Sequence, residues 1–176
     1  MKYASDTVQR RWNSPLGAID LAATPRGLSG LWFEDQKYRP AALDTAVGWP
    51  RHHGPHPVLD RVEEQLEAYF AGRLDRFDAP LDLPAATEFQ HAVWAGLLQL
   101  QHGRTCSYGE LALATGKPHA VRAVGTAVGR NPVSILVPCH RVVGANGDLT
   151  GYAGGLSRKS ALLALEQPQL VLEVQA

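Results

Sequence analysis

Val137-Pro138-Cys139-His140-Arg141 places one cysteine between a proline and a histidine, directly after the apolar residues Ile135 and Leu136. The apolar run 135–137 is typical of a short buried strand or extended segment. Proline fixes φ and lacks a backbone donor, so this strand must end at Pro138. The sequence therefore predicts that Cys139 lies at the exit of a rigid element, next to an imidazole that could activate its thiol.

A plainer interpretation of Cys139 stays open at this point. A lone cysteine is more often a small buried hydrophobic residue than a nucleophile. Short motifs also match by chance, so a cysteine beside a histidine is weak evidence for catalysis. The residues around this pair must decide between the two interpretations.

Further motifs occur along nearly the whole chain in a consistent order. After Ser14–Gly17 come Phe89-Gln90 with Val93-Trp94, Ser107–Ala112, Arg122–Gly125, Asn131-Pro132, Pro138–Val143 and Leu149–Leu156. Together they resemble the motifs of the O6-alkylguanine-DNA alkyltransferases. The resemblance implies an α+β fold with a small ribonuclease H-like lobe in residues 1–85. It implies a helical domain of winged-helix type, with a helix-turn-helix, in residues 86–176.

The charge of the chain gives little support to a large basic surface. The 176 residues have no net charge, and 45% of them are hydrophobic. Residues 1–85 carry 10 basic and 12 acidic side chains, whereas residues 86–176 carry 7 and 5. We therefore expect any DNA site to be a local patch.

The cysteine content points to a reducing compartment. Cys106 and Cys139 are too few for a disulfide framework or a zinc motif. The first residues contain no apolar leader, and no stretch approaches the length of a membrane span. We expect a cytoplasmic protein with no membrane association, which also suits a reactive thiol.

The amino-terminal half is predicted to be a scaffold. Alternating apolar residues in 7–33 predict three antiparallel strands, and residues 57–71 predict a helix that Gly72 ends. The remaining segments are predicted to be a loop in residues 39–57, with a helical turn near Ala41–Val47, and an extended linker in residues 73–86.

Three histidines in the loop form the one candidate metal site. His52, His53 and His56 are close in sequence, and histidine-rich tracts can bind metals. No regular element fixes their geometry, and structural zinc requires four defined ligands. No metal is predicted, although the question stays open.

Two capping boxes organise the carboxy-terminal half. Thr87–Gln90 predicts a helix that His102-Gly103 ends, and Ser107–Glu110 predicts a shorter helix to about Thr115. After a break, residues 119–129 predict a further helix, which completes a helix-turn-helix candidate.

The second helix of this pair is unusually rich in small residues. Such side chains allow a close backbone approach to a groove, and the resemblance implies that this helix enters the minor groove. By the same resemblance, Arg122 is a finger that fills the space of an extruded nucleotide. The predicted DNA contacts are Arg122, Ala123, Ala120, Gly125, Ser107 and Thr105.

The resemblance also implies the roles of the site residues. Cys139 accepts the alkyl group, His140 is a base that acts through a water, Glu166 orients His140, and Tyr108 protonates the departing guanine. Asn131 is the hinge residue that links the recognition helix to the cysteine. The predicted pocket consists of Tyr152, Ala153, Gly154, Gly155 and Val142.

The resemblance therefore implies a suicide DNA alkyltransferase. It would act as a monomer on duplex DNA containing O6-alkylguanine and transfer the alkyl group to Cys139 after flipping the nucleotide. No cofactor is expected, because the substrate itself carries the electrophile. A lesion-binding relative without transfer activity would lack the cysteine, and a regulatory sensor would need a longer chain. A hydrolase using Cys139, His140 and Glu166 remains a rival, and activity on O4-alkylthymine stays open.

Overall fold

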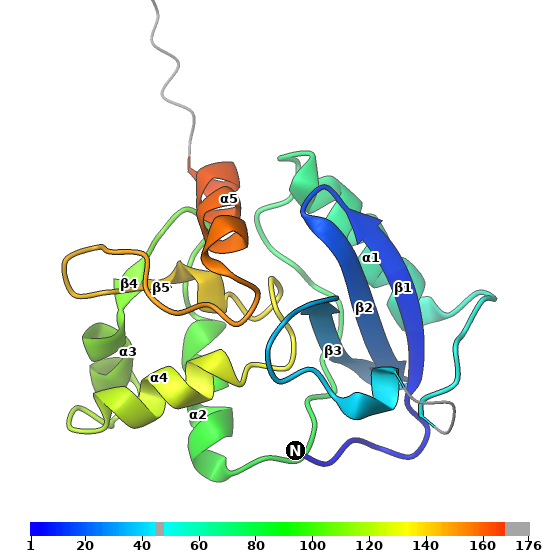
Figure 1. Ribbon diagram of the computed structural model, residues 1–176, viewed down its shortest axis with the longest axis horizontal. Helices are drawn as coiled ribbons and strands as arrows, with labels where there is room; N and C mark the ends of the chain where they lie inside the picture. Colours follow the sequence, from blue (N-terminus) through cyan, green and yellow to red (C-terminus); the bar gives the residue numbers. More distant parts are fainter. Residues whose placement is uncertain (45–47, 168–176) are drawn as a thin grey trace, which may run out of the picture.

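The computed structural model describes residues 1–44 and 48–167, which form two parts packed side by side (Figure 1). One part is an antiparallel sheet with a helix against it, and the other is a group of short helices around a two-stranded sheet. This architecture confirms the predicted α+β class. Among the described residues, no helix is long and apolar enough to cross a membrane.

The three predicted strands form one antiparallel sheet in the order β1-β2-β3. They are β1 (Val8–Ser14), β2 (Gly17–Thr24) and β3 (Gly27–Phe33). Short turns connect Ser14 to Gly17 and Thr24 to Gly27. Gly17 has a φ of 109°, a left-handed value that favours glycine, and the Ser14 hydroxyl donates to its carbonyl at 2.6 Å. These short turns fix the register, in which Leu21 pairs with Leu31.

Both faces of the sheet are covered, which explains why β3 is buried along its whole length. Helix α1 (Pro57–Phe70) packs its apolar stripe of Leu59, Val62 and Leu66 against one face. The other face carries a small cluster of Ala22, Trp32 and Leu43, with Tyr3 and Trp49 at its edge. The predicted helical turn is the short 3-10 helix η1 (Ala41–Leu43), although residues 45–47 of that prediction lie outside the described residues.

The histidine-rich loop has a structural use. His56 is the N-cap of α1, and its Nδ1 accepts a hydrogen bond from the Leu59 backbone N–H at 3.3 Å. The His52 ring nitrogen Nε2 lies 3.1 Å from the Pro55 carbonyl. Two of the three histidines are thus engaged with backbone groups, as capping residues commonly are.

Residues 73–86 do not behave as a free linker. Leu81 forms a bridge with Leu28 of β3, and Ala85 forms another with Lys2. The segment thus supplies hydrogen-bond partners to the exposed edge of the sheet, which would otherwise be unpaired. The prediction of an extended segment is correct, but the segment is part of the sheet's edge.

The second part contains the predicted helical pair. Its elements are α2 (Glu88–Leu97), β4 (Cys106–Ser107), α3 (Tyr108–Ala114), α4 (Val121–Gly129), η2 (Cys139–Arg141), β5 (Val142–Val143) and α5 (Leu156–Glu166). Both predicted capping boxes are present. Helix α2 ends at Leu97, before the predicted stop at His102-Gly103, because Gln99 and Leu100 make tighter i→i−3 turns.

The predicted strand at 135–137 is wrong. The segment is a turn, in which the Val137 N–H donates to the Val133 carbonyl at 3.0 Å. Ile135 has a φ of 70°, a costly conformation for a β-branched residue. Only Val133 pairs as a strand residue, in an isolated bridge with Leu31 of β3. Side-chain hydrogen bonds from Asn131 replace the strand pairing that the apolar run predicts.

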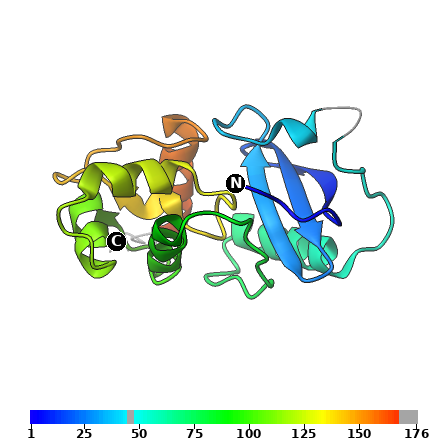
Figure 2. The same ribbon diagram turned by 90° about the horizontal axis from the view of Figure 1, so that it is seen from below.

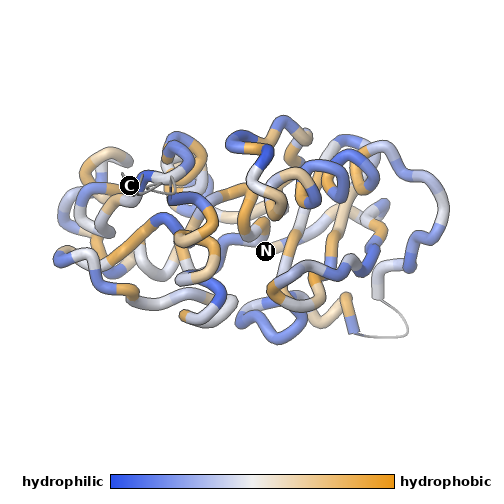
Figure 3. Tube along the Cα trace, turned by 90° about the horizontal axis from the view of Figure 1, so that it is seen from above, coloured by the Kyte–Doolittle hydropathy of each residue, from blue (hydrophilic) through white to orange (hydrophobic). Residues whose placement is uncertain are grey.

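One hydrophobic core joins the two parts. Buried residues of the sheet and α1 belong to the same cluster as those of α2, α4 and the 133–137 turn. Figure 2 shows this turn lying between the sheet and α4, and Figure 3 shows hydrophilic segments along the outer loops. The first part therefore supports the segment that carries Cys139.

Candidate active site and nucleic-acid interface

Cys139 lies in a buried turn that Asn131 holds in place. The cysteine is 5% exposed and is the first residue of η2. The side-chain amide of Asn131 donates to the Val133 and Val137 carbonyls at 3.2 and 2.7 Å, and lies 3.1 Å from Cys139 Sγ. Because Asn131 directly follows α4 and Arg130, this side chain connects the end of that helix to the sulfur.

His140 and Glu166 form a buried pair beside the thiol. The ring nitrogen Nε2 of His140 lies 2.7 Å from Glu166 Oε1, and both residues are almost fully buried. Arg141 binds the same carboxylate through Nε at 2.7 Å and Nη2 at 3.0 Å. Arg141 therefore pairs with the carboxylate that also binds His140. The other ring nitrogen, Nδ1, has no partner among the described residues and remains available.

The electrostatics of this group favour an uncharged thiol and an uncharged imidazole at rest. Burial raises the pKa of Cys139, although the Asn131 amide and the Lys159 charge oppose this shift. Burial also lowers the pKa of His140 despite its hydrogen bond to Glu166. A neutral imidazole can accept a proton, so His140 can serve as a base toward a protonated Cys139.

Glu166 is the charged member of the group. Burial alone would raise its pKa, but hydrogen bonds from His140 and Arg141 outweigh burial and hold the pKa far below its ordinary value. A carboxylate that is buried, paired and hydrogen-bonded in this way fixes the orientation of the histidine.

Lys159 is a site residue that sequence reasoning missed. Its side chain is fully buried, and its Nζ donates to the Val142 and Thr150 carbonyls, each at 2.6 Å. Burial lowers the pKa of Lys159, and the nearby Cys139 opposes this shift. The available signal was a lysine on the buried stripe of α5, together with Leu162 and Glu166.

Tyr108 and the loop after residue 149 lie on the outer side of the site. The Tyr108 hydroxyl donates to the carbonyls of Gly151 at 3.2 Å and Thr150 at 3.4 Å. Burial raises its pKa, so the phenol keeps its proton and can donate it. Val142, another residue of the predicted pocket, is buried in β5 and pairs with Cys106 of β4.

The first part of the molecule contacts the predicted pocket loop, residues 152–155. The Lys37 N–H donates to the Ala153 carbonyl at 3.0 Å, and Arg158 donates to the carbonyls of Gly154 and Leu16. A Cβ at Gly154 would lie 2.8 Å from the Tyr152 ring and 3.0 Å from Phe33, so only glycine fits there without displacement. Gly155 has a φ of 90° and starts α5. These contacts fix the backbone of the loop.

The predicted DNA contacts lie on α4, at its N-cap Ala120, and on the segment 105–107 that leads into α3. Arg122, Ala123 and Thr105 are exposed, while Ala120 and Gly125 are partly covered. Gly125 lies against the Tyr108 ring, where a Cβ would make an ordinary contact at 3.6 Å. Ser107 caps α3 through its hydroxyl, so its side chain is already engaged with the Glu110 N–H.

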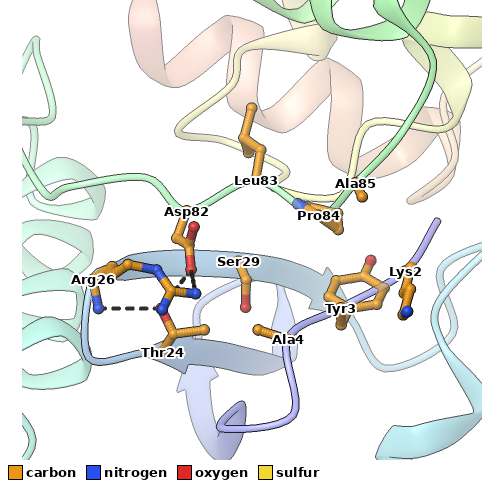
Figure 4. Close-up of a pocket in the computed structure, with 10 residues that line it drawn as sticks. All are labelled: Lys2, Tyr3, Ala4, Thr24, Arg26, Ser29, Asp82, Leu83, Pro84 and Ala85. Atoms are coloured by element: carbon orange, nitrogen blue, oxygen red, sulfur yellow. Dashed lines mark hydrogen bonds and ion pairs between the residues drawn. The ribbon is translucent and has the colours of Figure 1, made fainter.

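Two cavities of the molecule do not include the thiol in their lining. One of about 300 Å³ separates the segment 2–4 from residues 82–85, and Figure 4 shows Thr24 and Arg26 turned toward Asp82 in its wall. Another, of about 660 Å³, lies between residues 75–77 and the turns at 98–102 and 135–138. Cys139 lines neither cavity, although its chain neighbour Pro138 and the nearby Arg141 line the second one.

Both parts of the chain match families of known proteins. Residues 8–83 match the family described as 6-O-methylguanine DNA methyltransferase, ribonuclease-like domain, and residues 88–168 match its DNA binding domain. A methylated-DNA–protein-cysteine methyltransferase of Mycobacterium leprae is 48% identical over 162 residues, which are 92% of this chain and 93% of the relative.

Solved structures agree with this match. The crystal structure of the Mycobacterium tuberculosis O6-methylguanine methyltransferase superposes with a TM-score of 0.80 at 46% identity, covering 92% of this chain and 93% of that one. The Mycobacterium tuberculosis OGT in complex with DNA gives 0.81 at 45% identity, covering 90% and 92%.

Proposed function

The chain belongs to the 6-O-methylguanine DNA methyltransferase family, and on this premise we propose that it repairs O6-alkylguanine in duplex DNA by transferring the alkyl group to Cys139. The observation that carries the proposal is the buried thiol held by Asn131 at 3.1 Å, beside a neutral His140 that Glu166 orients at 2.7 Å. Such a group has the parts of an activated nucleophile.

In the proposed reaction, one bond forms and one breaks. The sulfur of Cys139 attacks the alkyl carbon, and the bond between that carbon and guanine O6 breaks. The thiol proton passes to His140 Nδ1, and a water is the natural bridge because no direct hydrogen bond joins these atoms among the described residues. Tyr108 protonates the departing guanine, and the thioether that remains cannot be regenerated.

The proposed nucleotide site requires the base to leave the helix. An O6-alkyl group cannot reach a buried sulfur while its base is stacked, so the nucleotide must be flipped at a cost of about a few kcal/mol. The exposed face of α4 carries Arg122 among small residues, which suits insertion into the minor groove. The proposed contacts are those predicted from the sequence, although the hydroxyl and the backbone N–H of Ser107 are both engaged in the capping box of α3.

Arg122→Ala is expected to slow repair of O6-methylguanine in duplex DNA far more than reaction with a free O6-alkylguanine base. The guanidinium would stabilise the flipped state, and a free base needs no flipping. Single-turnover rates with the two substrates measure the difference. Arg104→Ala, which removes another exposed basic side chain from the same part of the molecule, serves as the control. Equal slowing of both reactions by Arg122→Ala would contradict the finger role.

The methylated protein is expected to melt at a lower temperature than the unmodified protein. A methyl group on the sulfur enlarges a 5% exposed side chain packed against Asn131, and overpacking typically costs about 1–3 kcal/mol. About 1 kcal/mol lowers the midpoint by roughly 2–4 °C in a chain of this size. Differential scanning calorimetry before and after reaction measures the shift, and an unchanged or raised midpoint would refute the strain argument.

The domain division, the oligomeric state and the location in the cell are also proposals. The division into residues 1–85 and 86–176 is supported by the two family matches, which end at 83 and begin at 88. We also propose that the protein is a monomer and that it lies in the cytoplasm. The two free thiols support the location, because they suit a reducing compartment.

Stoichiometry tests the proposed function. With an excess of duplex DNA carrying a labelled O6-methylguanine, transfer is expected to stop at one methyl group per protein molecule. Continued turnover would favour the rival hydrolase, and a protein that binds the lesion without acquiring label would exclude alkyl transfer.

A further inference from the structure

We infer that Tyr69, a residue of the amino-terminal part, is a positioning residue for alkyl transfer that holds the Glu166 carboxylate in place for His140. This inference rests on the proposed function and extends it to a residue outside the helical part. Its basis is one buried hydrogen bond between residues far apart in sequence: the Tyr69 hydroxyl donates to Glu166 Oε1 at 2.8 Å.

The hydroxyl binds the same oxygen atom that binds the histidine. Glu166 Oε1 lies 2.7 Å from His140 Nε2 and also accepts from Arg141 Nη2 at 3.0 Å. Oε2 accepts from Arg141 Nε at 2.7 Å and lies 3.4 Å from the Gly103 N–H. Every donor therefore restricts rotation of the carboxylate, and Tyr69 is the only one among these from the first part of the molecule.

The location of Tyr69 makes its hydroxyl a rigid donor. The residue is 1% exposed on α1, and its ring contacts Phe70, Phe77 and His102 at centroid distances of 5.4, 5.3 and 6.3 Å. Burial raises its pKa, and the negative charge of Glu166 raises it further, so the phenol keeps its proton. A donor on a buried, packed ring costs little additional entropy to align.

The ionisable groups around His140 and Glu166 determine how the rate of transfer depends on pH. A hydrogen bond to a carboxylate stabilises its charged form and disperses part of its negative charge. The carboxylate then attracts a neighbouring imidazolium less strongly, and the pKa of that histidine is lower. Removing the Tyr69 hydroxyl should therefore make His140 easier to protonate. The groups that face Glu166 and His140, or contact Tyr69, are Arg141, Lys159, Cys139, Tyr152 and His102.

Tyr69→Phe keeps the packed ring and removes only the hydroxyl. Single-turnover transfer from saturating O6-methylguanine duplex is measured from about pH 5 to pH 8, the range in which histidine titrates. We expect the plateau rate to fall about tenfold, the size of effect that one hydrogen bond to a charged group can have. The transfer rate should fall at low pH as His140 becomes protonated, and we expect this acidic limb of the profile to move to higher pH in the variant. DNA affinity should be unchanged.

Tyr3→Phe is the matched control. It deletes the same atom from the same part of the molecule, where the Tyr3 hydroxyl is buried and has no partner among the described residues. This variant should keep the wild-type rate and pH limb. If Tyr69→Phe only melts lower, with rate and limb unchanged, Tyr69 merely packs and the inference is overturned.

A second variant covers the case in which Tyr69→Phe does not fold. Site-specific replacement of Tyr69 by 3-fluorotyrosine keeps the hydroxyl but makes it more acidic and a stronger donor. The acidic limb should then move to lower pH, and an unmoved limb would overturn the inference. Absence of transfer by the wild-type protein would instead refute the proposed function, so the two failures are distinguishable.

Discussion

Cys139→Ala is expected to abolish alkyl transfer and to leave binding to duplex DNA nearly unchanged. The sulfur is the atom that must form the new bond, so no residual transfer is possible without it. The proposed DNA contacts on α4 and in residues 105–107 do not include Cys139, which is buried. Label transfer and fluorescence anisotropy with the same duplex measure the two properties.

Cys106→Ser is the control for that variant. Cys106 is half-buried on β4, burial raises its pKa, and it has no histidine beside it in the sequence. This variant should retain most activity, and a loss above about tenfold, or roughly 1.4 kcal/mol of barrier, would give Cys106 a role in the reaction. A comparable loss of DNA binding in Cys139→Ala would contradict the separation of the thiol from the DNA surface.

Glu166→Ala is expected to have the largest effect on stability. The substitution leaves the Arg141 guanidinium buried without its carboxylate and removes the partner of His140. Breaking a buried charge pair costs about 3–5 kcal/mol, which corresponds to roughly 10 °C in the midpoint for a chain of this size. Thermal unfolding at neutral pH measures the change. Glu64→Ala, which breaks an exposed pair with Arg61, should cost well under 1 kcal/mol by comparison.

Acid should remove the difference between wild type and Glu166→Ala. The folded-state pKa of Glu166 is depressed, so its contribution to stability is fully present above the unfolded pKa of about 4.3 and is lost as pH falls below it. Urea unfolding at a series of pH values should show the gap intact from neutral pH down to about pH 5 and narrowing below about pH 4. A gap that stays constant into strong acid would show that folding does not lower the pKa of Glu166.

Local signals in the sequence predict much of this fold. The capping boxes at Thr87 and Ser107 each involve residues three apart, so they are visible without tertiary information. The same holds for the tight turn at Gly17 and for the end of α1 near Gly72. Helix and strand positions follow from these signals because their partners are close in sequence.

The parts that could not be predicted depend on distant partners. The run at 135–137 has the composition of a strand, but Asn131 supplies hydrogen bonds that hold it as a turn. Lys159 and Tyr69 lie on helical stripes that look like ordinary core positions. Their polar atoms meet carbonyls and a carboxylate that only the folded chain brings near. The support that the first part gives to the site is therefore invisible to local patterns.

Intact mass spectrometry after reaction with duplex DNA containing O6-methylguanine tests the central claim most directly. We expect the protein to gain the mass of one methyl group, and peptide mapping to place it on the fragment that contains Cys139. An unchanged mass, or a methyl group on any other residue, would contradict the claim that Cys139 is the alkyl acceptor.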